Sequence, residues 1–205
     1  MSVVENVKTI TIAGLIAVGL MVQALPAQAA GNETLTVAGG CFWCVEADFE
    51  KVKGVKGAFS GFAGGKTANP SYKQVTSGGT GHYEAVQITF DPSVVSASTL
   101  LDLFFRSVDL TDASGQFCNR GQSYSTAIFA TSSQKAEAEQ AKSKAQSDLG
   151  QKIVTPILGA AKFYPADAYH QDYAKGKNWS SRALVPKVRQ MITRRITKPV
   201  VVTSA

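Results

Sequence analysis

Apolar and polar residues alternate along the chain with two different periods, which predict a mixture of strands and helices. Residues 35–38 form a short apolar strand that ends at two glycines. The next segment, 42–52, has apolar residues three and four positions apart, as on one face of a helix, and Gly54 is a suitable end for it. Residues 55–62 are a candidate strand, and residues 83–90 alternate strictly, as a strand does.

The second half of the chain continues with the same kinds of element. Ser98 is the expected N-cap of a helix with four large apolar residues. Residues 123–130 predict a strand, 132–149 a polar surface helix, and 153–158 a last strand before an aromatic loop. The order strand, helix, strand, strand, helix, strand predicts an α+β fold, a two-layer sandwich of ferredoxin-like type with extra loops and additions.

One residue on the apolar face of the strand at 83–90 is unusual. Glu84 points the same way as Val86, Ile88 and Phe90, because side chains two positions apart share a face. Burial of a carboxylate is costly unless it is neutral or paired, so the pKa of Glu84 should be raised, as suits a general acid near neutral pH. The alternative is a carboxylate that reaches solvent at the strand end.

The start of the 205-residue chain has the pattern of a secretory signal. A positively charged beginning precedes an apolar run over residues 10–25, and Ala27-Gln28-Ala29 supplies a small-x-small cleavage pattern. We predict a signal peptide over residues 1–30, a single domain over 31–205, and an exported protein, periplasmic or secreted. An uncleaved N-terminal anchor is the alternative.

The composition is that of a globular protein. Hydrophobic residues make up 44% and charged residues 18% of the chain, which excludes disordered and fibrous classes. The net charge is +6, and eight Lys and Arg residues, with no acidic residue among them, follow Ala174. We expect a solvated basic extension from about residue 176 rather than a contact with nucleic acid or anionic lipid, because an exported protein meets little nucleic acid.

The three cysteines indicate redox chemistry. Cys41, Cys44 and Cys118 are too few for a disulfide scaffold, and an odd number in an exported protein suggests a pair with a reactive third thiol. Cys41 lies where a strand ends and a helix begins, so free backbone N–H groups and the helix dipole should favour its thiolate near neutral pH. Cys44 follows one helical turn later, close enough for a disulfide.

The same Cys-x-x-Cys pair has two other interpretations. It could be a structural disulfide, or half of a zinc site whose further ligands would come from Cys118, His82 and His170. We expect His82 to be a structural hydrogen-bonding residue. Trp43, between the thiols, is expected to form the wall of an apolar pocket, whereas buried packing is an alternative for Phe42.

Several motifs together resemble the A-type peptide methionine sulfoxide reductases, in the subtype with the sequence Gly-Cys-Phe-Trp-Cys. The resemblance covers about residues 34–175 in collinear order. The motifs are residues 40–43, 69–72, 77–86, Tyr124 with 127–129, and 163–166 with 169–171.

The resemblance implies a role for each matching residue. Cys41 would be the nucleophile, and Phe42 and Trp43 would hold the substrate methyl group. Members of the family act on the S epimer of methionine sulfoxide. The residues expected to bind and protonate the sulfoxide oxygen are Glu84, Tyr72 and Tyr124, with Asn119 at the border of the pocket.

The chain departs from the family pattern at several positions. Asn119 stands where the family usually has Asp, and Ser123 and Ser125 replace the usual Gln and Arg. Loss of the Asp charge is expected to lower the pKa of Glu84 and to weaken proton delivery. The usual glycine-rich cysteine tail is also missing, so recycling must use Cys44 or Cys118.

The implied reaction needs no metal, flavin or nucleotide. Cys41 would attack the protonated sulfoxide, release methionine and become a sulfenic acid, which a second thiol converts to a disulfide. An external dithiol of thioredoxin type would then reduce that disulfide. The expected partners are oxidised proteins or peptides that contain methionine sulfoxide, and this reductant. We expect a monomer with no nucleic-acid partner and no membrane association after signal cleavage.

Two other classes of protein fit part of the pattern. An exported thiol–disulfide oxidoreductase would use Cys-x-x-Cys at a helix start, but Glu84 and the two tyrosines would then have no task. A non-enzymatic binding module, with the thiols in a structural bridge, would show no thiol reactivity. Turnover of the two sulfoxide epimers with dithiothreitol distinguishes the three classes.

Overall fold

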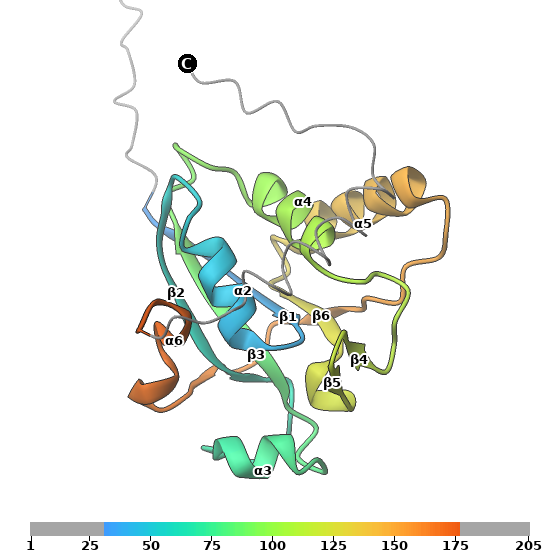
Figure 1. Cartoon of the computed structure of the whole chain (residues 1–205). Coiled ribbons are helices and arrows are strands. Elements are labelled where there is room, and N and C mark those ends of the chain that lie inside the picture. The colour runs from blue at the N-terminus through green and yellow to red at the C-terminus, as the bar shows by residue number, and fades with distance from the viewer. Residues whose placement is uncertain (1–30, 177–205) are drawn as a thin grey trace, which may run out of the picture.

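A computed structural model of the chain describes residues 31–176 (Figure 1). The predicted signal peptide over 1–30 and nearly all of the predicted basic extension lie outside the described residues. Among residues 31–176, no helix is both long enough and apolar enough to cross a membrane.

The centre of the fold is a six-stranded sheet in the order β7-β6-β1-β3-β2-β8. All neighbouring strands are antiparallel except β6 and β7, which are parallel. The strands are β1 (Glu33–Gly39), β2 (Val55–Ala63), β3 (Tyr83–Phe90), β6 (Thr126–Ala130), β7 (Ile157–Gly159) and β8 (Tyr164–Pro165), and a separate hairpin pairs β4 (Gly115–Gln116) with β5 (Asn119–Arg120).

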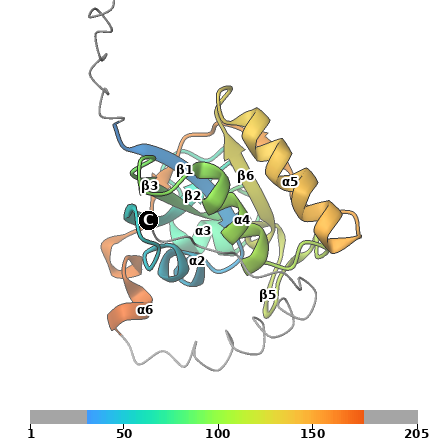
Figure 2. The same cartoon turned by 90° about the horizontal axis from the view of Figure 1, so that it is seen from above.

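Helices pack on one face of this sheet. Figures 1 and 2 show α2 and α4 side by side over the strands, with α5 next to α4. The helices are α2 (Phe42–Phe49), α3 (Tyr72–Thr76), α4 (Ala97–Ser107), α5 (Lys135–Leu149) and α6 (Tyr173–Gly176), with 3-10 turns η1 (Gln122–Tyr124) and η2 (Ala168–His170). The order β1-α2-β2-β3-α4-β6 and the antiparallel arrangement β6-β1-β3-β2 confirm the predicted ferredoxin-like α+β sandwich.

The main core lies between the sheet and the helices. It joins the apolar faces of α2 and α4 to alternate residues of the central strands, such as Val37, Val86 and Ile88. A smaller cluster around Phe129 lies on the opposite face, against the chain between β7 and β8. Leu158, Ala161 and Phe163 of this part of the chain therefore cover part of the second face.

Two predicted element starts were wrong. The N-cap of α4 is Ser96 rather than Ser98, because the Ser96 hydroxyl accepts a hydrogen bond from the Thr99 N–H at 3.2 Å. The strand predicted over 123–130 begins at Thr126, because the preceding residues form the 3-10 turn η1. The turn matters for the site, since it carries Tyr124.

Other elements differ in length. The helix predicted over 42–52 ends at Phe49, the one over 132–149 begins at Lys135, and the last predicted strand is reduced to β7. Helix α3 was not predicted, because five residues are too few to show a helical period. Its start is marked by a capping box between Ser71 and Gln74.

Candidate active site

The predicted nucleophile lies at the start of α2, as the sequence indicates. Cys41 is the N-cap residue and is half-buried, whereas Cys44 is exposed one turn later, with its N–H donating to the Cys41 carbonyl at 3.0 Å. Gly40 has a φ of +85°, and a Cβ there would lie 2.5 Å from Cβ of Gln116. A glycine is therefore required where the β4–β5 hairpin packs against the chain before Cys41.

The pKa values of the Cys41 and Cys44 thiols shift in opposite directions. A hydrogen bond with Cys44, followed by burial, raises the pKa of Cys41, and the same hydrogen bond lowers the pKa of Cys44. The backbone N–H groups of Trp43 and Cys44 do lower the pKa of Cys41, as expected at a helix start, but they are outweighed. The predicted lowering of the Cys41 pKa at the helix start is therefore not found, because the hydrogen bond from Cys44 and burial raise that pKa.

Glu84 is buried beneath the start of α2. Its side chain is 2% exposed, and its Oε2 accepts a hydrogen bond from the Phe42 N–H at 3.1 Å. Burial raises the pKa of Glu84 to about 8, and the bond from Phe42 and the Tyr124 hydroxyl only partly offset that rise. The predicted burial of Glu84 and the rise of its pKa are confirmed, and its role as a general acid stays a prediction. Within the part of the chain that the structure describes, Oε1 meets no hydrogen-bond partner at standard geometry.

Tyr72 and Tyr124 bring two hydroxyl groups to this carboxyl group. Their hydroxyls form a hydrogen bond with each other, and Asn119 also bonds Tyr124. Burial, followed by the charge of Glu84, raises the pKa of both tyrosines, so both keep their protons and can donate. Tyr72 begins α3 and Tyr124 ends η1, so the fold unites the two hydroxyls with Glu84 of β3.

Aromatic rings surround Trp43 beside the thiol pair. Tyr173 stacks on the half-buried Trp43 ring at 4.0 Å between centroids, and Tyr72 stacks on it at 6.2 Å. The indole N–H of Trp43 donates to Nδ1 of His170 at 3.2 Å. Phe42 is 1% exposed and packs into the main core, so it supports the other rings from below.

Two residues of this aromatic cluster were not predicted as site residues. The sequence shows an aromatic loop around His170 and Tyr173, and that richness in rings is the signal that could have identified them. Burial lowers the pKa of His170, which keeps the ring neutral and able to accept the indole N–H.

Cys118 lies at the turn of the β4–β5 hairpin and is exposed. Its neighbours on the two strands reach the site, because Gln116 packs at Gly40 and Asn119 bonds Tyr124. Residue Phe117, just before the thiol, has a left-handed φ of +53°. The hairpin thus brings a third thiol to the rim of the site.

The zinc interpretation of the cysteines finds no support. In residues 31–176, the one group of three possible metal ligands is Glu46, Glu50 and Asp172, and it includes no cysteine. His82 is engaged elsewhere, since Nδ1 accepts from the Gly65 N–H at 3.1 Å and Nε2 bonds the Thr67 carbonyl at 2.8 Å. The prediction of a structural role for His82 is confirmed.

Comparisons with known proteins agree with this geometry. A family model described as peptide methionine sulfoxide reductase matches residues 33–199. Peptide methionine sulfoxide reductase MsrA 2 of Rhizobium meliloti (strain 1021) is 52% identical over 152 residues, 74% of this chain and 76% of that protein.

Solved structures give the same result. The reduced form of Mxr1 from Saccharomyces cerevisiae has a TM-score of 0.68 and 30% identity, over 77% of this chain and 92% of Mxr1. Methionine sulfoxide reductase A of Corynebacterium diphtheriae has a TM-score of 0.67 and 29% identity, over 75% of this chain and 77% of that one. The stretch matched by the family model contains every site residue described above.

Proposed function

Because the chain belongs to the A-type peptide methionine sulfoxide reductases, we propose that Cys41 and Glu84 carry out its thiol-dependent sulfoxide reduction on the S epimer, free or in peptides. One observation supports this assignment above all. The carboxyl group of Glu84 is buried at the start of α2, where Cys41 is the N-cap residue, and its pKa is raised to about 8. A carboxyl group that is still protonated at neutral pH can donate to the sulfoxide oxygen.

In the first step, the sulfoxide oxygen accepts hydrogen bonds from Tyr72 and Tyr124 and takes the proton of Glu84. The Cys41 thiolate attacks the sulfoxide sulfur, and the oxygen, with its proton, ends on the cysteine sulfur. Methionine is released, Cys41 becomes a sulfenic acid and Glu84 becomes a carboxylate. The sulfoxide is reduced by two electrons, and the cysteine is oxidised by the same two. Trp43 forms the apolar wall beside the methyl group.

The raised pKa of Cys41 does not block this step. Cys44, whose pKa is lowered by the hydrogen bond between the thiols, can take the proton of Cys41 once it is ionised, and that transfer creates the Cys41 thiolate. The N–H groups of Trp43 and Cys44 favour the charge at that position.

Cys44 is the thiol that we expect to resolve the sulfenic acid. It is exposed, lies one turn from Cys41 and already hydrogen-bonds that sulfur, so its effective concentration is high. Attack of Cys44 on the sulfenic sulfur releases water and forms the Cys41–Cys44 disulfide. Cys118, at the hairpin turn, could accept the disulfide by later exchange and present it to a reductant.

Disulfide mapping tests this order. After oxidation with one equivalent of substrate, peptide mass spectrometry is expected to find the Cys41–Cys44 bond first, because this pair needs no loop movement. The Cys118→Ser variant serves as the control and should form the same bond at an unchanged rate. A dominant Cys41–Cys118 bond with free Cys44 would reverse the order and leave Cys44 a packing residue.

The remaining parts of the cycle follow from the chemistry. The disulfide needs two electrons from outside, and a dithiol of thioredoxin type supplies them by exchange, with no prosthetic group or metal in the cycle. The proposed substrates are oxidised proteins or peptides that contain methionine sulfoxide, and we propose that the protein acts on them as a monomer. The proposed function is therefore protein repair after oxidation.

The proposed location is outside the cytoplasm. Its support is the apolar run over residues 10–25 with the small-x-small pattern that follows it. N-terminal sequencing of the exported protein is expected to begin at Ala30 or Gly31, and a start at Met1 would indicate an uncleaved anchor.

The direct test of the activity uses the two epimers of methionine sulfoxide with dithiothreitol as reductant. We expect methionine from the S epimer and none from the R epimer, because a site that binds the sulfoxide oxygen through the tyrosine hydroxyls and the methyl group at Trp43 fixes two substituents of a chiral sulfur. An exported thiol–disulfide oxidoreductase would instead reduce a protein disulfide and leave both epimers unchanged.

A further inference from the structure

Glu46 is a buried acidic residue that the proposed reaction does not use. It lies on α2 one turn after Trp43 and is 2% exposed. A carboxylate is buried at high cost unless its oxygens are hydrogen-bonded. Both are: Oε2 accepts from the Ser60 hydroxyl of β2, and Oε1 accepts from the Asp172 backbone N–H at 2.7 Å. One side chain thus joins α2, β2 and the C-terminal part of the described chain.

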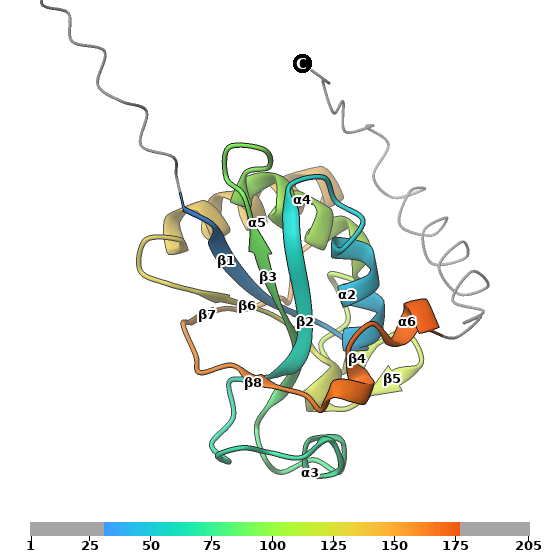
Figure 3. The ribbon, with the colours of Figure 1, turned by 90° about the vertical axis from the view of Figure 1, so that its left-hand side faces the viewer.

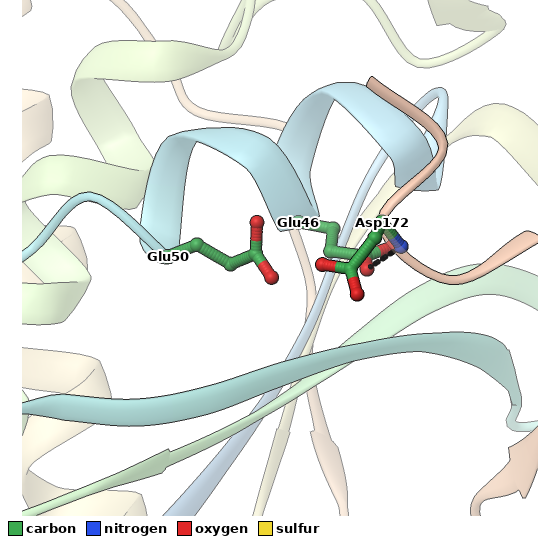
Figure 4. A group of neighbouring side chains, drawn as sticks. All are labelled: Glu46, Glu50 and Asp172. Atoms are coloured by element: carbon green, nitrogen blue, oxygen red, sulfur yellow. Dashed lines mark hydrogen bonds between the residues drawn. The ribbon is translucent and has the colours of Figure 1, made fainter. Parts of the chain in front are cut away.

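Figure 4 shows this arrangement, with Glu46 directed towards the backbone of Asp172 and Glu50 one turn farther along the helix. A positively charged side chain lies beside the three acidic groups. Lys175 donates to Glu50 at 2.8 Å and to Asp172 at 2.7 Å. The group therefore connects α2 to the C-terminal segment, and nothing in it indicates a bound cation.

The hydrogen bond reaches a conformationally strained residue. Asp172 has a φ of +53°, in the left-handed region that non-glycine residues seldom adopt. Such a conformation persists where the surrounding structure fixes it, and the Glu46 carboxylate holds the N–H of this residue. Gln171, the preceding residue, is fixed as well, since its side chain bonds both backbone groups of Ser60 at 2.9 Å.

The residues on either side of this turn face Trp43. His170 accepts the indole N–H two residues before Asp172, and Tyr173 stacks on the indole ring immediately after it. Figures 1 and 3 both place α6, which begins at Tyr173, beside α2. The turn at Asp172 therefore sets the positions of two rings that contact Trp43.

We propose that Glu46 is a positioning residue for substrate binding: it holds the Asp172 turn so that His170 and Tyr173 keep the Trp43 ring in place. This inference rests on the proposed role of Trp43 as the wall for the substrate methyl group. Glu46 acts through the affinity for sulfoxide and leaves the chemical step at Cys41 unchanged.

The test replaces Glu46 by methionine, which has a similar length and no acceptor. We expect Glu46→Met to raise KM for methionine sulfoxide about tenfold, the scale of one lost hydrogen bond to a charged group, with kcat nearly unchanged. Glu46→Gln should restore KM, because its amide oxygen can accept the Asp172 N–H and its amide nitrogen can donate to Ser60 Oγ. The matched control is Glu50→Met, which removes the side-chain contacts with Lys175 and Asp172 and leaves the bond from the Asp172 N–H to Glu46 in place.

A second readout needs no substrate. In a Trp179→Phe background, which leaves Trp43 as the only tryptophan, Glu46→Met should increase acrylamide quenching of the fluorescence, and Glu46→Gln and Glu50→Met should not. Wild-type KM and wild-type quenching in Glu46→Met would overturn the inference, as would a Glu46→Gln variant as impaired as Glu46→Met. An inactive wild-type protein would instead contradict the proposed function, because the quenching result does not depend on activity.

Tyr173→Leu keeps the inference testable if Glu46→Met does not fold. Since Glu46 is proposed to act through this ring, Tyr173→Leu should raise KM and the quenching of Trp43 in the same way. Where both variants fold, the double variant should be no worse than the more impaired single one. Additive effects on KM, or a Tyr173→Leu variant with wild-type KM, would show that Glu46 does not work through Tyr173.

Discussion

Replacement of Cys41 by serine is expected to abolish sulfoxide reduction, with a loss of roughly a thousandfold or more, the scale for removal of a covalent nucleophile. A serine hydroxyl at the α2 N-cap remains protonated at neutral pH and cannot take the oxygen from sulfur. The fold should be unaffected, because serine is a good N-cap residue and Cys41 is only half-buried. The measurement is methionine released from the S epimer in the presence of dithiothreitol.

The matched control is the same change at the other thiol of the pair. Cys44→Ser should still release one equivalent of methionine per enzyme without reductant, because it retains the nucleophile and loses only the proposed resolving thiol. Its Cys41 should then react with a sulfenic-acid probe such as dimedone. Methionine production by Cys41→Ser would refute the nucleophile assignment.

Replacement of Glu84 by glutamine is expected to slow reduction by roughly a hundredfold or more, the usual effect of losing a general acid. The amide is nearly the same size and can still accept the Phe42 N–H, but it has no acidic proton to give. Steady-state kinetics with the S epimer measures the loss, and circular dichroism checks the fold. A near-normal rate would transfer the acid role to Tyr72 or Tyr124.

The pH dependence gives Glu84 a second signature. The active form is protonated, so kcat/KM of the wild type should fall as pH rises through about 8, and Glu84→Gln should lack that decline.

The stability of the folded protein should also depend on the protonation of Glu84. A carboxyl group whose pKa is raised on folding binds its proton more tightly in the folded state, so its contribution to stability is lost as pH rises towards about 8. Glu84→Gln should therefore gain in Tm relative to the wild type between pH 5 and pH 9.

Asn119 shows how a single departure from the family pattern can be accommodated. The expectation was that loss of a negative charge would lower the pKa of Glu84. Burial is the largest influence on that pKa and still raises it to about 8, and Asn119 retains a hydrogen bond to Tyr124. The raised pKa of Glu84 therefore does not require an acidic residue at position 119.

Periodicity alone placed the two central residues of the site correctly. The strict alternation of 83–90 puts Glu84 on the face with Val86 and Ile88, because a strand has only two faces. The change from a strand pattern to a helix pattern around Gly39 and Gly40 likewise puts Cys41 at a helix start. Short-range geometry determines both positions, and the βαββαβ order of the core follows from the same patterns.

Only the tertiary structure decided which groups meet at the site. The bond from the Phe42 N–H to Glu84 spans 42 residues, and the one from Trp43 to His170 spans 127. The spacing of apolar residues along a segment shows which face a side chain occupies. It does not show which residues of another element pack against that face. The opposite shifts of the two thiol pKa values were unpredictable for a related reason, since the hydrogen bond between the side chains outweighs the helix start.

Glu46 is the clearest example of this limit. Its position on the buried face of α2 could be recognised from the spacing, but an acidic residue on a short helix is usually solvated. It is stable there because Ser60 and Asp172, far along the chain, supply donors to both carboxylate oxygens. The sequence by itself thus determined most of the secondary structure, the core face and the raised pKa of Glu84, since these depend on neighbours along the chain. The folded structure alone determined the shifts of the thiol pKa values, the ring contacts and the partners of buried charges, since these depend on neighbours in space.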